Sequence, residues 1–230
     1  PDVSLLRNVA RYIKRRYKGA RPMRGISALR NLGHWTQSHY AHLYLTSRGF
    51  QCIELFEPIN PEYRDISCIE SRKYAAENIV LYNPVKGIKL TKQIIDANPN
   101  IDFVPLQGFS QAEMVYQFQR AKLYLDLGHH PGRDRMPREA ALLGCCVVTS
   151  KKGSAGNSID VPLPEHYKID TTQPDFVHTT SFVIHSILEN HSIHFEAQRE
   201  FRNHIDFEFD RYRENIIKAL AHAEQLWNVK

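Results

Sequence analysis

Short apolar runs alternate with segments of helical length from residue 78 onward, and this alternation limits the possible folds more than any other feature. The apolar runs are residues 78–84 (NIVLYNP), 101–109 (IDFVPLQGF), 122–128 (KLYLDLG), 145–150 (CCVVTS) and a shorter run at 166–170 (HYKID). The helix-length segments are residues 87–97, 110–120, 138–144, 174–190 and 194–227. Apolar strands separated by helices form right-handed βαβ units, whose parallel sheet is covered on both faces. The sequence therefore predicts an α/β fold with a Rossmann-like, doubly wound parallel sheet over residues 78–230, ending in C-terminal helices.

Residues 1–77 predict a smaller N-terminal unit. Within it, residues 31–60 read as a strand, a helix and a second strand, and residues 62–77 read as a polar connector. We therefore expect a short α/β segment ahead of the main sheet, with a domain boundary at residue 77.

The net charge of +5 is concentrated at one end of the chain, where residues 1–30 hold nine Lys or Arg against one Asp. Apolar residues recur there at helical spacing between basic ones, which predicts an amphipathic basic helix. One interpretation is contact between residues 1–20 and an anionic membrane surface or an acidic polymer. The alternative is a solvated helix with one face on the core. A nucleic-acid partner is not expected, because the interleaved aromatic residues of single-strand platforms are missing from the sequence.

Four cysteines without CxxC spacing favour a reduced compartment over a disulfide framework, so we expect a cytoplasmic protein, peripheral on the inner face of the membrane if residues 1–20 bind it. Cys145 and Cys146 are expected to pack as small apolar residues. Trp35, Tyr40 and Tyr44 are expected in the core rather than stacked on a sugar.

Ligands of open α/β sheets bind beyond the carboxyl ends of the strands. The segments predicted at that edge are residues 83–87, 107–108, 128–139 and 151–158. Residues 128–139 (GHHPGRDRMPRE) hold three arginines, two histidines, two carboxylates and two glycines, more polar chemistry than a connector needs. A GxGxxG fingerprint is absent from the sequence, which disfavours a dinucleotide.

Three short motifs occur in a fixed order along the chain, and the order is more informative than any one motif. They are Lys86-Gly87 after the first run, Gly108-Phe109-Ser110 after the second, and Glu139-Ala140 followed by Gly144 and Val147-Val148. As an ordered set over about residues 78–170, they resemble the donor-binding half of GT-B glycosyltransferases. Residues 1–77 would then be a remnant of the acceptor half.

The resemblance implies a role for each matching residue. Lys86, beside Gly87, would contact the donor diphosphate, Glu139 the ribose hydroxyls, and the loop that begins Gly153-Ser154 the phosphates or the sugar. Gly108 would line the donor site. Arg133, Arg135 and Arg138 would add charge in a fork geometry that suits phosphate. An alternative for Glu139 is a first-turn acid that complements a helix dipole.

The chain departs from the pattern at Pro131, where retaining members have a second glutamate. The nearest carboxylate is Asp134, which we take with His130 as the candidate catalytic pair; Asp126 could cap a turn or act as a base. His129 and His130 could be metal ligands, but neighbours in sequence rarely converge on one ion, so no metal and no other cofactor is expected.

The resemblance implies a glycosyltransferase that moves a sugar from a nucleotide-activated donor to a saccharide or lipid-linked acceptor, in surface polysaccharide biosynthesis. The alternative is a non-catalytic module that has kept the nucleotide-sugar pocket. Lys86 and the arginines would stabilise the charge on the leaving diphosphate, so no metal would be required.

Overall fold

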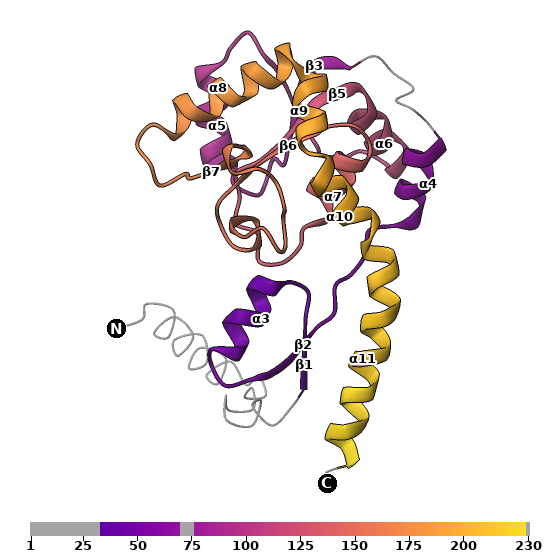
Figure 1. Ribbon diagram of the computed structural model, residues 1–230. Helices are drawn as coiled ribbons and strands as arrows, with labels where there is room; N and C mark the ends of the chain where they lie inside the picture. Colours follow the sequence, from indigo (N-terminus) through magenta and orange to yellow (C-terminus); the bar gives the residue numbers. More distant parts are fainter. Residues whose placement is uncertain (1–32, 70–75, 229–230) are drawn as a thin grey trace, which may run out of the picture.

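A five-stranded parallel sheet forms the core of the larger part of the molecule in a computed structural model that describes residues 33–69 and 76–228 (Figure 1). The strands are β3 (Glu77–Tyr82), β4 (Asp102–Pro105), β5 (Ala121–Asp126), β6 (Cys146–Ser150) and β7 (Lys168–Ile169). Their order across the sheet is β4-β3-β5-β6-β7, and each neighbouring pair is parallel. The order in which the chain adds strands reverses between β3 and β5: β4 lies on the outer side of β3, whereas β6 and β7 follow on the outer side of β5. The crevice at such a switch point is the usual ligand site.

Helices cover both faces of this sheet, which confirms the predicted doubly wound α/β architecture. The helices α5 (Ile88–Ala97) and α8 (Phe176–Glu189) pack together on one face. On the other face, α6 (Gln111–Arg120) packs beside α7 (Arg135–Leu142). The buried residues of β5 and β6 lie between these two layers and supply much of the apolar core.

Local sequence signals explain where several helices begin. Ser110 and Glu113 form a reciprocal capping box at the start of α6, as the sequence predicts. The helix α7 begins at Arg135, three residues before the predicted start at 138. Pro137 lies in its first turn, where a missing N–H has no intrahelical partner to lose.

The predicted helix over residues 194–227 is wrong in its continuity, because the chain breaks there into three helices. These are α9 (His191–Ala197), α10 (Arg199–Asp206) and α11 (Glu208–Asn228). At the first break, the amide of Gln198 accepts a hydrogen bond from the backbone N of Val147 at 2.8 Å and donates one to its backbone O at 3.1 Å. β7 is too short to pair with that part of β6, so the side chain of Gln198 replaces the missing strand.

A smaller unit precedes the main sheet. It contains β1 (Gly33–Thr36) and β2 (Gln51–Glu54), which pair in parallel, with α3 (His39–Thr46) between them. The predicted connector is partly helical, because α4 (Pro61–Ile69) packs against α7. The last helix, α11, begins beside α10, runs along this unit and contacts β1 and β2 (Figure 1). The boundary at residue 77 stays a prediction, although strands on its two sides belong to separate sheets.

Two of the three aromatic residues expected in the core are exposed. Trp35 keeps 52% of its surface exposed and Tyr44 45%, because the two-stranded sheet is too small to cover them. Tyr40 is half-buried, with its ring edge-on to His129 at 6.2 Å. Cys145 and Cys146 are buried, as predicted.

The predicted basic helix, including residues 1–20, lies outside the described residues. Within the described part of the chain, none of the helices is both long and apolar enough to cross a membrane.

Candidate functional site

Lys86 and Asp126 meet at the switch point of the main sheet. Lys86 lies in the loop after β3, and Asp126 is the last residue of β5. The Nζ atom of Lys86 lies 3.1 Å from Oδ2 of Asp126. The backbone N–H of Gly128 donates to Oδ1 of the same carboxylate at 3.0 Å, and the Tyr124 hydroxyl lies 3.3 Å from Oδ2.

Asp134 and His130 complete a group that we call the charge cluster: Lys86, Asp126, His130 and Asp134. The ammonium of Lys86 also contacts the carboxylate of Asp134. His130 Nδ1 lies 2.9 Å from Asp134 Oδ2, and His130 Nε2 lies 3.6 Å from Asp126 Oδ1. The two carboxylates therefore hold both the ammonium and the imidazole between them. Asp134, with 26% of its side chain exposed, is the carboxylate nearer to solvent, since Asp126 is buried.

Two glycines allow these loops to approach one another. Gly87 has φ 72°, in the left-handed region, and a Cβ added there would lie 2.6 Å from the backbone N of Gly128. A Cβ added to Gly128 would overlap the side chain of Lys86. The Lys86-Gly87 motif is thus required for close contact between the loop after β3 and the loop after β5.

The pKa of Asp134 reflects opposing effects. Burial raises it, but hydrogen bonds from His130 and Lys86 outweigh burial and leave the pKa below its ordinary value. Asp134 is therefore ionised at neutral pH. The pKa of Tyr124 is raised well above its ordinary value by burial and by the charge of Asp126, so its hydroxyl stays protonated and can donate to that carboxylate.

Gly153 and Ser154 support the loop that carries His130. The backbone N of Ser154 donates to the His130 carbonyl at 2.9 Å, and its hydroxyl donates to the Gly132 carbonyl at 2.6 Å. A Cβ on Gly153, where φ is 72°, would overlap the His130 carbonyl oxygen. The structure brings this loop beside the charge cluster through backbone contacts, and a contact with donor phosphate or sugar stays a prediction.

Arg133 and Arg138 point to a partner that the sequence analysis missed. Both guanidinium groups are buried and bind the carboxylate of Glu208, the first residue of α11; the Arg138 Nη1 to Glu208 Oε2 distance is 2.5 Å. Arg138 also donates to the backbone carbonyl of Glu57 at 3.0 Å. These contacts connect α7, α11 and the segment after β2, so the geometry does not favour the predicted phosphate contacts of these two arginines. No sequence signal relates Glu208 to residues some 70 positions earlier.

Arg135 and Glu139 lie on α7. Arg135 is exposed in its first turn, whereas Glu139 is buried in the second turn. Burial raises the pKa of Glu139, and the charges of Arg135 and Arg138 partly offset this effect. A first-turn role for Glu139 at the helix dipole is therefore disfavoured. Gly108 lies exposed in the loop after β4, on the far side of β3 from the charge cluster.

Three members of the charge cluster have the donor atoms for a divalent cation. In residues 33–69 and 76–228, the ligand atoms of Asp126, His130 and Asp134 lie within 4.8 Å of one another. Oxygen and imidazole ligands suit Mn²⁺, Mg²⁺ or Zn²⁺. The ammonium of Lys86 already lies between the two carboxylates and supplies the positive charge that a metal would otherwise bring.

The start of α3, in the N-terminal unit, contacts the loop after β6. Asp160, which is buried, accepts hydrogen bonds from the backbone N of His39 at 2.7 Å and of Tyr40 at 2.9 Å, at the start of α3. Its carboxylate therefore caps α3 and joins the smaller unit to the loop after β6.

No protein-family model matches the chain, and no curated protein matches it. Among solved structures, the chain is similar to the catalytic domain of starch synthase IV from Arabidopsis thaliana bound to ADP and acarbose, with a TM-score of 0.55 and 10% sequence identity. The match covers 83% of this chain and 56% of that one, so the chain spans little more than half the length of the neighbour. This likeness shows the fold: the chain has a GT-B-like architecture.

Proposed function

We propose that this chain binds a nucleotide-activated sugar at the carboxyl edge of β3 and β5 and transfers its glycosyl group to a saccharide or lipid-linked acceptor. One observation carries the proposal: Lys86 is held at the switch point of the sheet, where ligands of such folds bind. The GT-B-like fold supports sugar transfer at a coarse level, since the neighbouring starch synthase is itself a glycosyltransferase that binds ADP and a saccharide analogue.

The main chemical contribution of Lys86 is electrostatic. As the glycosidic bond breaks, negative charge grows on the leaving diphosphate, and an ammonium fixed beside it lowers the energy of that state. The partly exposed carboxylate of Asp134 is the partner of Lys86 that a diphosphate would displace, because Asp126 is buried beneath. Arg135, exposed at the start of α7, would add a second positive charge.

Asp134 and His130 have separate tasks in this proposal. Asp134 is ionised and partly exposed, so it can accept a hydrogen bond from a hydroxyl of the donor sugar or the acceptor. His130 is almost fully buried and holds the Asp134 carboxylate through Nδ1. Asp134 is thus the candidate catalytic residue and His130 a positioning residue.

Glu139 is the proposed ribose ligand. Glu139 is buried in α7, and its carboxylate forms no ion pair with another described residue. Its raised pKa means that the buried charge is costly in the free protein. Two ribose hydroxyls would supply hydrogen-bond donors to that carboxylate.

A second candidate function is a module that binds the nucleotide sugar without turnover. Pro131 favours it, because the position carries no carboxylate, and so does the pairing of Lys86 with two acids in the free protein. For the enzyme, the proposed setting is cytoplasmic assembly of a surface polysaccharide, with residues 1–20 on an anionic membrane. That setting is supported by the motif resemblance and by the basic sequence of the N-terminus.

Calorimetric titration with ADP, UDP and GDP tests the donor site. We expect at least one to bind, and Lys86→Met to weaken it by about ten- to a hundredfold, the value of a charge-assisted hydrogen bond. Lys92→Met, which removes the charge of an exposed lysine of α5, is the matched control and should bind like the parent. Absence of binding at millimolar nucleotide, or an unchanged affinity in Lys86→Met, would overturn the proposal.

Turnover separates the enzyme from the module. The sugar conjugate of the nucleotide that binds is incubated with the protein and a panel of saccharides, and release of the nucleoside diphosphate is followed. Release that depends on the saccharide and is lost in Asp134→Asn supports the transferase. Binding without release under every acceptor supports the module.

A further inference from the structure

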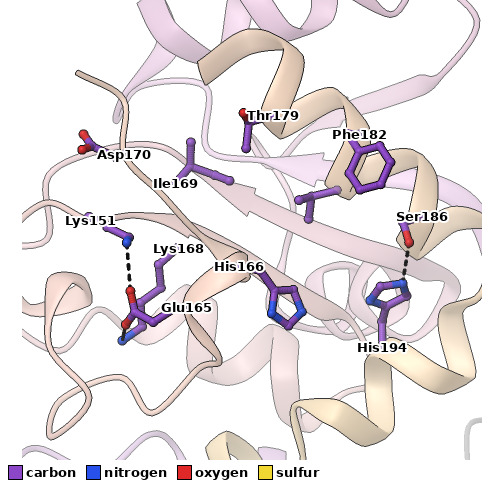
Figure 2. Close-up of a pocket in the computed structure, with 11 residues that line it drawn as sticks. Lys151, Glu165, His166, Lys168, Ile169, Asp170, Thr179, Phe182, Ser186 and His194 are labelled. Atoms are coloured by element: carbon purple, nitrogen blue, oxygen red, sulfur yellow. Dashed lines mark hydrogen bonds and ion pairs between the residues drawn. The ribbon is translucent and has the colours of Figure 1, made fainter. Parts of the chain in front are cut away.

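A groove of about 520 Å³ opens beside β7, away from the charge cluster. Its walls come from β7 and the turn before it, from α8 and from α9 (Figure 2). The charge cluster lies at β3 and β5, whereas β7 is the outermost strand on the other side of β6. The groove and the charge cluster therefore lie at different strands, although Lys151 of the groove also belongs to the predicted edge segment 151–158. The groove volume is within the range of small-molecule sites.

A buried ammonium lies in the wall of this groove. The side chain of Lys168 is 0% exposed, and its Nζ atom has no hydrogen-bond acceptor among the described residues. The carboxylate oxygen Oε1 of Glu165 is 3.7 Å away, too far for a hydrogen bond. Burial accordingly lowers the pKa of Lys168. A buried ammonium without an acceptor is costly, so a ligand that supplied one would be bound favourably.

Glu165 occupies the position where such an acceptor would lie. Its carboxylate is 69% exposed and bridges two lysines, with Oε2 2.9 Å from Lys151 Nζ and Oε1 3.7 Å from Lys168 Nζ (Figure 2). The pair of Glu165 with Lys151 is exposed and contributes little to stability, so Glu165 can leave it at small cost when another carboxylate takes its place beside the buried Lys168. The geometry shows that one carboxylate fits between the two ammonium groups, and a carboxylate from another molecule can do the same.

The rest of the groove is suited to an apolar body. Ile169 and Val183 line it, and Phe182 of α8 projects beside it with 70% of its surface exposed. The imidazole of His194 is fixed between the hydroxyls of Ser186 and Tyr167, at 2.8 Å from each. Burial and the neighbouring His166 lower the pKa of His194, so it adds no positive charge at neutral pH.

We propose that this groove binds a small organic carboxylate, with the anionic group between Lys151 and Lys168 and an apolar or aromatic body against Phe182 and Val183. Binding requires the side chain of Glu165 to move aside. The proposal does not rest on the proposed function, because none of the groove residues belongs to the charge cluster.

Benzoate is a suitable probe, with benzamide as its neutral analogue and phenyl phosphate as an alternative anion. By calorimetry or ligand-observed NMR on the full chain, we expect benzoate to bind at millimolar or lower concentration and benzamide about tenfold more weakly, because the amide carries no charge. Phenyl phosphate should not exceed benzoate, because the gap between the lysines matches one carboxylate.

Two variants act in opposite directions. Lys168→Met should lower the affinity for benzoate by about tenfold or more, because the buried ammonium is lost. Glu165→Gln should raise the affinity severalfold, because the side chain that occupies the place of the ligand carboxylate loses its charge. Lys218→Met and Glu189→Gln, exposed residues of α11 and α8, are matched controls and should bind like the parent. Lys86→Met should also leave benzoate affinity unchanged, which keeps this test distinct from that of the donor site. Circular dichroism checks the fold of each variant.

Two results with the parent protein would overturn the proposal: no benzoate binding up to about 10 mM, or equal binding of benzamide. Two further results would do the same: an unchanged or lower benzoate affinity in Glu165→Gln, or binding of phenyl phosphate about tenfold tighter than that of benzoate. The Glu165→Gln variant keeps the proposal testable if Lys168→Met does not fold, because it alters an exposed side chain.

Discussion

Arg138 of α7 and Glu208 of α11 form a buried ion pair, with Nη1 and Oε2 2.5 Å apart. Because Arg133 binds the other oxygen of the same carboxylate, one acid is shared by two buried guanidinium groups. This contact fixes the last helix to the helix that carries Glu139, and α11 continues from there to β1 and β2. The position of the smaller unit relative to the proposed donor site thus depends on Glu208.

Removing Glu208 should be strongly destabilising. Glu208→Ala leaves two buried guanidinium groups unpaired, and breaking a buried pair in this way costs about 3–5 kcal/mol. Urea denaturation followed by circular dichroism measures the change. The control is Asp210→Ala, two residues along α11 and exposed, which should alter the free energy of unfolding by less than about 0.5 kcal/mol. A loss below about 1 kcal/mol in Glu208→Ala would mean that water reaches the arginines.

Substitutions of Gly87 and Gly108 by alanine should separate the cost of a left-handed backbone from the cost of a steric clash. Both have positive φ, 72° and 78°, but only at Gly87 does an added Cβ meet backbone, 2.6 Å from the N of Gly128; at Gly108 it meets nothing within 4 Å. Gly108→Ala should therefore cost about 1–2 kcal/mol, the price of a left-handed conformation for alanine. Gly87→Ala should cost more and should also weaken nucleotide binding, since Lys86 shifts with the loop. Equal losses of stability and binding in the two variants would count against the packing argument.

Because of Asp134, the free energy of unfolding should depend on pH in the acid range. Its folded pKa lies below the ordinary value of 3.8, so it contributes stability that is fully present above that value and is lost as the pH falls through the lowered folded pKa. The difference in unfolding free energy between the parent and Asp134→Asn should thus be constant near neutral pH and shrink below about pH 4. Denaturation at several pH values measures it, with Asp102→Asn, an exposed site on β4, as the control. A difference that grows on acidification would mean that the pKa is raised instead.

The sheet could be predicted from sequence because parallel strands buried on both faces are apolar along their length, as the runs that become β3, β5 and β6 are. The predicted edge is also where Lys86 and residues 128–139 lie. The pairings could not be predicted, because they depend on contacts that cross the chain. Lys86 pairs with acids 40 and 48 residues away, and Arg138 with one 70 residues away. Local patterns likewise could not reveal the helix break at Gln198, because its cause is the short β7.

Glu139→Gln separates the proposed ribose contact from a purely structural role. Burial raises the folded pKa of Glu139, so its charge lowers stability above that pKa; the variant should therefore be more stable than the parent at pH 7, by an amount that disappears as the pH falls toward the ordinary value of 4.5. The same change should lower the affinity for a ribonucleoside diphosphate by about tenfold or more and leave the affinity for pyrophosphate unchanged, because in the proposed site only ribose hydroxyls donate to this carboxylate.

Thermal unfolding and calorimetric titration of both ligands provide these measurements, with Glu200→Gln, an exposed site on α10, as the control. A gain in stability together with a loss of ribonucleotide affinity identifies a carboxylate kept for binding at a cost to the fold, which is the expected behaviour of functional residues. A first-turn acid at a helix dipole behaves differently: its loss lowers stability by a few tenths of a kcal/mol and leaves both ligands unaffected. Should Glu139→Gln be less stable than the parent and bind the ribonucleotide normally, Glu139 is part of the packing of α7 and the ribose contact must be sought elsewhere along the edge.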